Sequence, residues 1–236
     1  MKAGVFGIIR VVYCVFGAEL ALDLGVGLPL AVVASFTIIV ASIFALAQDN
    51  LKLRLAYSTV SQLSYIVLGA ALLSPYGLMG GMVHITHQAF MKITLFFCTG
   101  AILVQTDKKN ISEMDGIGKK MPLTMAAFAI AALGMIGIPL TCGFISKWYL
   151  CLGAIEAGYP IFLLVMLVSA LLNAAYFMPP VYSAFFKKPD ESLLKSKEPS
   201  WWLLAPILIC AAYILDTGHR TEDAKHAFTV GLGVDL

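Results

Sequence analysis

A largely apolar stretch from Gly77 to Val104 carries two histidines and a lysine near its middle, and it constrains the fold more than any other feature. It exceeds the roughly 20 apolar residues that a helix needs to cross a bilayer. On such a helix four polar residues share one side: His84, His87, Gln88 and Lys92. Ionisable side chains at membrane depth cost several kcal/mol, so they face protein, water or a partner. The stretch therefore predicts a buried polar stripe that carries protons.

Composition agrees with a membrane protein. Charged residues make up 13% of the 236 residues and hydrophobic ones 60%, whereas soluble domains carry about 25% charged residues. The net charge of +2 includes no basic tract for nucleic acid. The five cysteines form no CxxC or CxxH pattern, so we expect no metal site and no cofactor. We find no catalytic motif, and whether the chain serves an enzyme complex as a non-catalytic subunit stays open.

We expect an all-α integral membrane protein with about seven transmembrane helices, one of them broken. The predicted segments are residues 3–17, 28–47, 55–73, 77–104, 122–157, 160–186 and 201–215. Residues 1–215 then form one transmembrane domain. Residues 216–236 form a polar C-terminal tail without an assigned role.

The fifth segment is interrupted at Pro139-Leu-Thr-Cys-Gly143 and reads either as one broken helix or as a hairpin. Loop charge separates these readings. With one broken crossing, ten lysines and arginines fall in loops on one side of the membrane, and the opposite loops hold none. This is the positive-inside pattern, which favours a broken helix and cytoplasmic basic loops. The location that we expect is the cell (inner) membrane of a prokaryote.

The two buried lysines are the leading candidates for a proton relay. Lys92 lies too far inside its stretch for its amine to reach the membrane surface easily. Lys147 follows the break, and broken membrane helices are tolerated where they line a cavity or are buried in protein. A lysine that merely caps the broken helix ends is the alternative for Lys147.

His84 and His87 titrate near physiological pH and suit a relay. Haem or metal ligation and ordinary hydrogen bonding are the alternatives. The other histidines, His219 and His226, lie in the tail, which disfavours haem.

A polar stripe in residues 55–73 either lines the path or binds neighbouring helices, since serine and glutamine form hydrogen bonds across membrane interfaces. Its members are Ser58, Ser61, Gln62 and Tyr65.

Three segments resemble the antiporter-like membrane subunits of respiratory complex I, membrane-bound hydrogenases and Mrp cation/proton antiporters. They are QDNLKLRLAYSTVSQLSY (48–65), HITHQAFMK (84–92) and GFISKWY (143–149). A fourth, KKNISEMDGIG (108–118), is most similar to the D-type Mrp subunit. The resemblance covers only the second of the family's two inverted repeats. The glutamate–lysine pair of the first repeat has no counterpart, and a separate polypeptide, an incomplete sequence and a real loss all remain open.

The resemblance implies roles for individual residues. Lys92 would match the lysine of the family's central helix, Lys147 the lysine of its broken helix, and His84 the relay histidine. His87 matches less well, because the family more often has histidine at the position of Gln88. Lys2 would match a lysine that connects the half-channels.

The implied function is proton translocation within a multisubunit cation/proton antiporter. Its partners would be other membrane subunits, the lipid bilayer, protons, and Na⁺ or K⁺. Two alternatives are a proton-pumping membrane subunit of a redox complex and a scaffold that conducts nothing.

Overall fold

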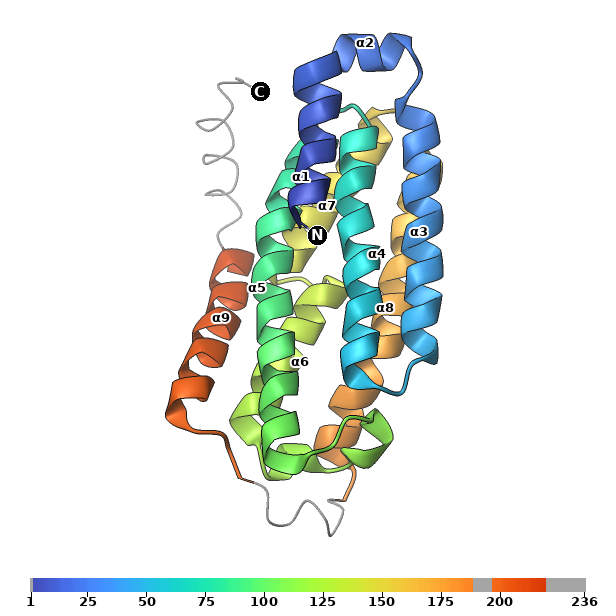
Figure 1. Cartoon of the computed structure of the whole chain (residues 1–236). Coiled ribbons are helices and arrows are strands. Elements are labelled where there is room, and N and C mark those ends of the chain that lie inside the picture. Colours follow the sequence, from blue (N-terminus) through green and yellow to red (C-terminus); the bar gives the residue numbers. More distant parts are fainter. Residues whose placement is uncertain (1, 189–196, 220–236) are drawn as a thin grey trace.

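The computed structural model describes residues 2–188 and 197–219, and every regular element in these ranges is helical. Long helices run side by side and form an elongated bundle (Figure 1). The helices are α1 (Lys2–Arg10), α2 (Ala18–Asp23), α3 (Gly27–Ala47), α4 (Leu51–Ala71), α5 (Pro75–Thr106), α6 (Pro122–Ile136), α7 (Cys142–Glu156), α8 (Pro160–Phe186) and α9 (Trp201–His219). A π-helical segment, η1 (Val11–Phe16), extends α1, and two short 3₁₀ turns, η2 (Ile111–Glu113) and η3 (Ile117–Lys119), precede α6.

The seven predicted membrane segments are confirmed as α1 with η1, α3, α4, α5, α6 with α7, α8 and α9. Among the described residues, α3, α5, α8 and most of α9 are each long and apolar enough to cross a membrane. The short helix α2 was not predicted. Helix α4 begins four residues earlier than predicted. Its start is fixed by the Asn50 side chain, which accepts hydrogen bonds from the backbone of Lys52 and Leu53.

Helices α6 and α7 follow one another along the long axis of the bundle and together make one broken crossing (Figure 1). The break covers residues 137–141, two residues earlier than predicted. Within the break the backbone leaves the helical conformation at Gly137 and Leu140, whose φ angles are positive, at 91° and 73°. The C-terminal ends of α3, α5 and α8 all lie at the lower end in Figure 1, as a single crossing requires.

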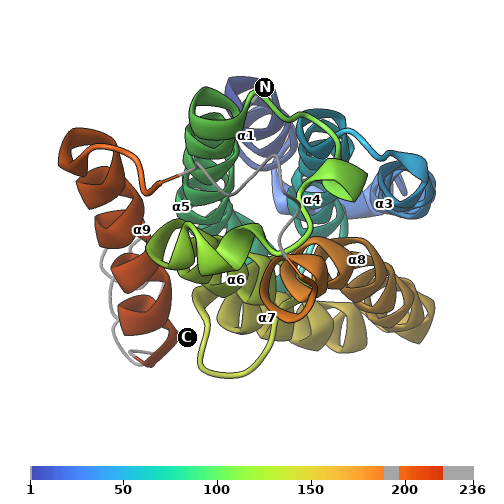
Figure 2. The ribbon, with the colours of Figure 1, turned by 90° about the horizontal axis from the view of Figure 1, so that it is seen from below.

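Helix α5 lies at the centre of the bundle and packs against α4, α6, α7 and α9. Seen from below, it lies between α4 and α9 (Figure 2). Small residues allow this close packing. A Cβ at Gly80 of α5 would lie 2.7 Å from the backbone nitrogen of Leu150 in α7, and one at Gly69 of α4 would lie 2.6 Å from the carbonyl oxygen of Gly77. The predicted polar stripe of α5, which contains His84 and Lys92, is therefore enclosed by protein.

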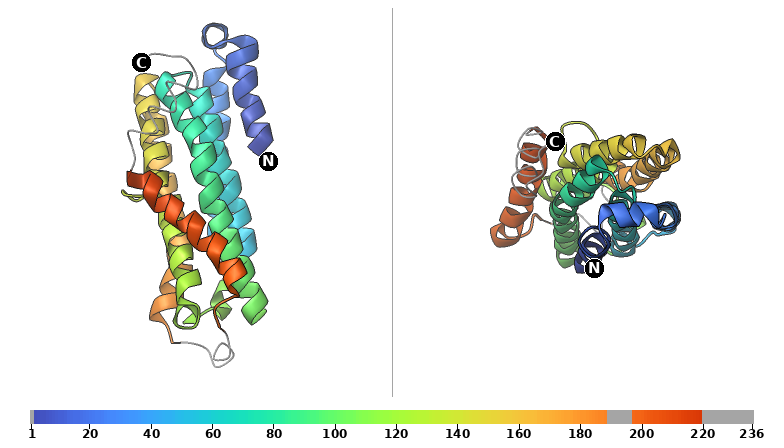
Figure 3. Two further views of the ribbon diagram at one scale, coloured as in Figure 1. Left: turned by 90° about the vertical axis from the view of Figure 1, so that its left-hand side faces the viewer. Right: turned by 90° about the horizontal axis from the view of Figure 1, so that it is seen from above.

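Helix α9 crosses the bundle obliquely (Figure 3, left). Its start is tied to α6 by Glu198, whose carboxylate accepts hydrogen bonds from the backbone of Leu123 and Thr124 and from the Thr124 hydroxyl. Its other end meets the break, because Gly218 packs directly against the carbonyl of Leu140. The helix extends four residues beyond the predicted end of the transmembrane domain at 215. Residues 220–236 of the predicted tail lie outside the described residues.

Candidate proton path in the bundle core

Lys92 of α5 points into the bundle and is only 5% exposed. Its Nζ donates hydrogen bonds to the carbonyl oxygen of Leu55, at 3.1 Å, and to the hydroxyl of Ser58, both on α4. The Phe177 ring of α8 lies 5.7 Å from the same nitrogen. The amine is therefore held by protein groups in the core and does not extend to the membrane surface.

His84 lies two turns along α5 and is fully buried. Its Nδ1 lies 2.8 Å from the Ser146 hydroxyl of α7, and its Nε2 lies 3.1 Å from Gln62 Oε1 of α4. The amide oxygen can only accept, so Nε2 donates to it. Both ring nitrogens are occupied by protein groups, and the histidine joins three helices.

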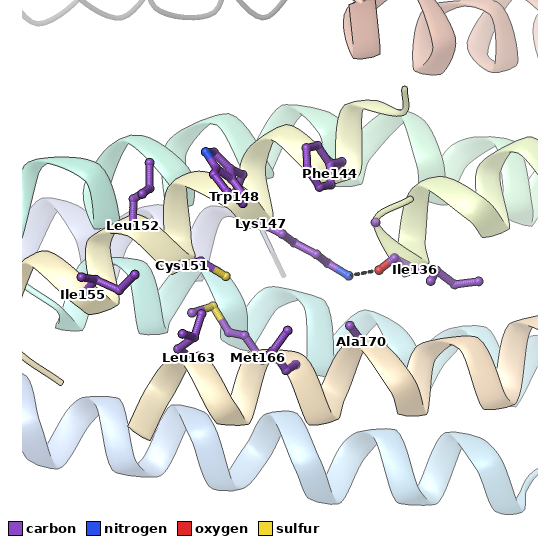
Figure 4. A pocket seen from close by; sticks show the side chains of 12 residues that line it. Ile136, Phe144, Lys147, Trp148, Cys151, Leu152, Ile155, Leu163, Met166 and Ala170 are labelled. Atoms are coloured by element: carbon purple, nitrogen blue, oxygen red, sulfur yellow. Dashed lines mark hydrogen bonds between the residues drawn. The ribbon is translucent and has the colours of Figure 1, made fainter. Parts of the chain in front are cut away.

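Lys147 of α7 reaches across the break to the end of α6. Its Nζ donates to the carbonyl oxygens of Met135 at 2.7 Å and Ile136 at 2.9 Å (Figure 4 shows the contact with Ile136). The break leaves these carbonyls without helical partners, and the negative end of a helix dipole favours a cation. The capping role that the sequence left open is thus present in the geometry. It does not exclude a relay, because an ammonium group has a third donor.

Tyr176 and Asn173 of α8, which were not predicted from the sequence, lie between the surroundings of Lys92 and His84 and those of Lys147. The Tyr176 hydroxyl donates to Asn173 Oδ1 at 2.5 Å and also interacts with the side chains of Ser58 and Gln62. Asn173 in turn donates to the Met135 carbonyl, which also accepts from Lys147. A signal was available in the sequence. Ser169, Asn173 and Tyr176 recur at helical spacing in an otherwise apolar segment.

Of the predicted polar stripe on α4, Ser58 and Gln62 contact Lys92 and His84. Ser61 turns instead toward α3, where its hydroxyl contacts Ser42 and donates to the Ile38 carbonyl. This is the helix–helix bonding that the sequence left open. Tyr65 lies near both His84 and Lys147. Its ring is 5.9 Å from the His84 ring and 5.3 Å from the Lys147 amine.

The remaining candidates lie around the same core. His87 is buried beside the start of α7 and interacts with the Cys142 backbone. Gln88 is fully buried, and neither of its amide atoms has a hydrogen-bond partner among the described residues. Lys2 is half-buried at the start of α1 and interacts electrostatically with His84. The structure thus brings all the predicted ionisable residues into one region.

The geometry does not favour the haem or metal alternative. Both nitrogens of His84 already have partners, so iron ligation through either nitrogen would break a buried hydrogen bond. Within residues 2–188 and 197–219, no group of three or more histidine, cysteine or acidic side chains is placed to hold a metal ion.

The sequence and the fold correspond to a known class of membrane protein. A family model described as "NADH:quinone oxidoreductase/Mrp antiporter, TM" matches residues 1–173. The chain belongs to this family of antiporter-like, multi-pass membrane subunits, which confirms the resemblance seen in its motifs.

Curated relatives with similar sequences include subunits of NADH oxidoreductases. NADH-quinone oxidoreductase subunit N of Desulforudis audaxviator is 45% identical over 166 residues, covering 70% of this chain and 33% of the relative. NADH-ubiquinone oxidoreductase chain 5 of Metridium senile is 31% identical, covering 98% and 38%. The chain therefore spans 33% and 38% of the length of these two curated relatives.

Solved structures share the fold. The Mrp complex from Dietzia sp. DQ12-45-1b aligns with a TM-score of 0.83 at 24% identity, covering 92% of this chain and 48% of that one. An archaeal membrane-bound sulfane sulfur reductase aligns with a TM-score of 0.77 at 28% identity, covering 81% and 32%. Multisubunit membrane complexes are thus the setting in which this fold occurs.

Proposed function

We propose that this chain translocates protons as part of a multisubunit membrane assembly, with Lys92, His84 and Lys147 as the groups that carry the proton. Lys2 and His87 are proposed to exchange protons at the margins of this core. Ser58, Gln62, Tyr65 and Gln88 are proposed to line the path. Ser61 contributes mainly by joining α3 to α4.

The observation that carries this proposal is the hydrogen bonding of His84. When the ring is neutral, Nε2 donates to Gln62 and Nδ1 accepts from the Ser146 hydroxyl. When the ring is protonated, Nδ1 donates to Ser146, whose hydroxyl can turn to the Gly143 carbonyl 3.2 Å away. Both ring nitrogens therefore keep their hydrogen-bond partners in either charge state, and only the direction of the Ser146 hydroxyl proton changes. A buried group normally pays for a change of charge by losing partners, so this arrangement suits a group that gains and loses protons.

Lys147 supplies the next step. His84 and Lys147 interact electrostatically, so a proton arriving on the histidine places a second positive charge near the ammonium. This repulsion favours release of a proton from Lys147, while the α6 carbonyls favour its return. The buried amide of Gln88 lies between His84 and Lys92 on α5, where a continuous path needs one further hydrogen-bonding group, such as water.

Two kinds of assembly are candidates for supplying the energy that moves the protons. A cation/proton antiporter exchanging Na⁺ or K⁺ is supported by the 108–118 motif and by the fold match to an Mrp complex. A redox complex is supported by the names of the curated relatives, including the NADH-quinone oxidoreductase subunit at 45% identity. Either assembly would lie in the cell membrane of a prokaryote. A non-conducting scaffold is the third possibility.

The test is reconstitution of the chain with its native partners in proteoliposomes that contain a pH-sensitive dye. A pH change that follows a Na⁺ or K⁺ pulse supports the antiporter, and one that requires quinone reduction supports the redox complex. Replacing Lys147 with alanine separates transport from scaffolding. The proposal expects loss of the pH change with the assembly intact, whereas a scaffold would show altered assembly and unchanged proton movement.

A further inference from the structure

A cavity of about 360 Å³ lies between α7 and α8, on the side of Lys147 that faces away from α5. Figure 4 shows its walls, which are almost entirely apolar. They include Trp148, Cys151 and Ile155 of α7, and Leu163, Leu167 and Ala170 of α8. Lys147 is the only charged residue among those that line it. Nothing in the proton path described above requires this space.

The cavity opens toward the outer surface of the bundle. Trp148 is 54% exposed, and Ile155 and Leu167 beside it are exposed as well. In a membrane this surface faces acyl chains. The opening is therefore accessible to molecules dissolved in the bilayer. The inner end holds the Lys147 amine, whose hydrogen bonds among the described residues go to two carbonyl oxygens and to no carboxylate.

We propose that this cavity binds a long-chain fatty acid from the bilayer. The carboxylate would contact the Lys147 ammonium, and the chain would lie along the apolar walls of α7 and α8. Charge complementarity selects an anionic head, because a buried charge without a partner is costly. The walls offer no other charged group that would hold a larger, zwitterionic phospholipid head, so a single-chain acid is the ligand that fits.

Binding at this place has a consequence for transport, which rests on the proposed function. A carboxylate beside Lys147 stabilises the ammonium form and accepts a hydrogen bond from it. The proton would then be retained on Lys147, and the relay would stop. The cavity is thus an inhibitory site for fatty acids.

Trp148 provides a direct measurement of binding. The chain has three tryptophans, and replacing Trp201 and Trp202 with phenylalanine leaves Trp148 as the only tryptophan of this chain. A matched complex that also carries Trp148→Phe gives the signal of the partner subunits, which is subtracted. The assembled complex in liposomes is titrated with a dibrominated fatty acid, whose bromines quench a neighbouring indole. The proposal expects saturable quenching. Brominated phospholipid at the same mole fraction should quench weakly and without saturation.

Variants locate the ligand. Ala170→Phe fills the cavity and should abolish saturation, and the smaller Ala170→Met should weaken it. Leu171→Phe, at the neighbouring lipid-facing position that does not line the cavity, is the matched control and should bind normally. Lys147→Gln should weaken binding about tenfold, because it removes one charge-assisted contact.

Non-saturable quenching that is equal in Ala170→Phe and Leu171→Phe would overturn the proposal. Absence of quenching in the assembled complex would overturn it as well, because a neighbouring subunit would then cover the opening of the cavity. The binding measurement does not depend on proton movement. Failure of the proposed function would appear separately, as proton flux that persists in Lys92→Ala.

Discussion

Replacing Ser58 with alanine tests how Lys92 is held. The Lys92 amine has two hydrogen-bond acceptors among the described residues, the Ser58 hydroxyl and the Leu55 carbonyl. The substitution is nearly isosteric and removes one of them, while the Leu55 carbonyl keeps its contact with Lys92. A hydrogen bond to a charged group contributes about 1.5–3 kcal/mol. Loss of this energy from the ammonium state should slow proton transfer roughly tenfold to a hundredfold.

The assay is the initial rate of dye-reported acidification in proteoliposomes that contain the assembled complex. Ser64→Ala is the matched control, because Ser64 is a buried serine of the same helix whose hydroxyl donates only to its own Val60 carbonyl. The control should retain the wild-type rate, and both variants should assemble equally. A Ser58→Ala rate equal to that of Ser64→Ala would refute the assignment of Ser58 and the geometry inferred around Lys92.

Three further substitutions test other contacts. Ser146→Ala removes the hydroxyl that serves both charge states of His84 and should lower proton flux about tenfold, measured in the same liposomes; an unchanged rate would contradict the switch. Gly143→Ala places a Cβ against the Gly134 carbonyl and should destabilise the protein by about 1–3 kcal/mol or more, measured as a lower melting temperature in detergent. Gly100→Ala is the control, because the space around its Cβ is open, and it should leave the melting temperature unchanged. Glu198→Gln removes charge-assisted bonds at the start of α6 and should cost about 1 kcal/mol, with faster amide exchange confined to that turn; no change in exchange would count against the cap.

The parts of the fold that the sequence predicted are those set by local pattern. Seven apolar segments, a broken crossing and a buried polar side of α5 all follow from segment length, loop charge and helical periodicity. His84, Lys92 and Lys147 were recognisable because ionisable side chains are rare in apolar segments. The family's motifs pointed to the same three residues.

Partners between distant helices were not predictable in this way. Ser58 and Ser61 are three positions apart on one helix, yet Ser58 contacts Lys92 of α5 and Ser61 contacts α3. That division depends on how α4 is rotated between its neighbours. Asn173 meets the Met135 carbonyl only because α8 packs beside the break. Such contacts depend on tertiary packing, which one sequence pattern does not determine.

The central claim is that protons pass through the buried Lys92, and one substitution tests it most directly. Lys92→Ala, reconstituted with the partner subunits and compared with wild type for equal assembly, should abolish formation of the pH gradient under the conditions that drive the wild-type complex. A correctly assembled Lys92→Ala complex that forms the gradient at the wild-type rate would contradict the claim.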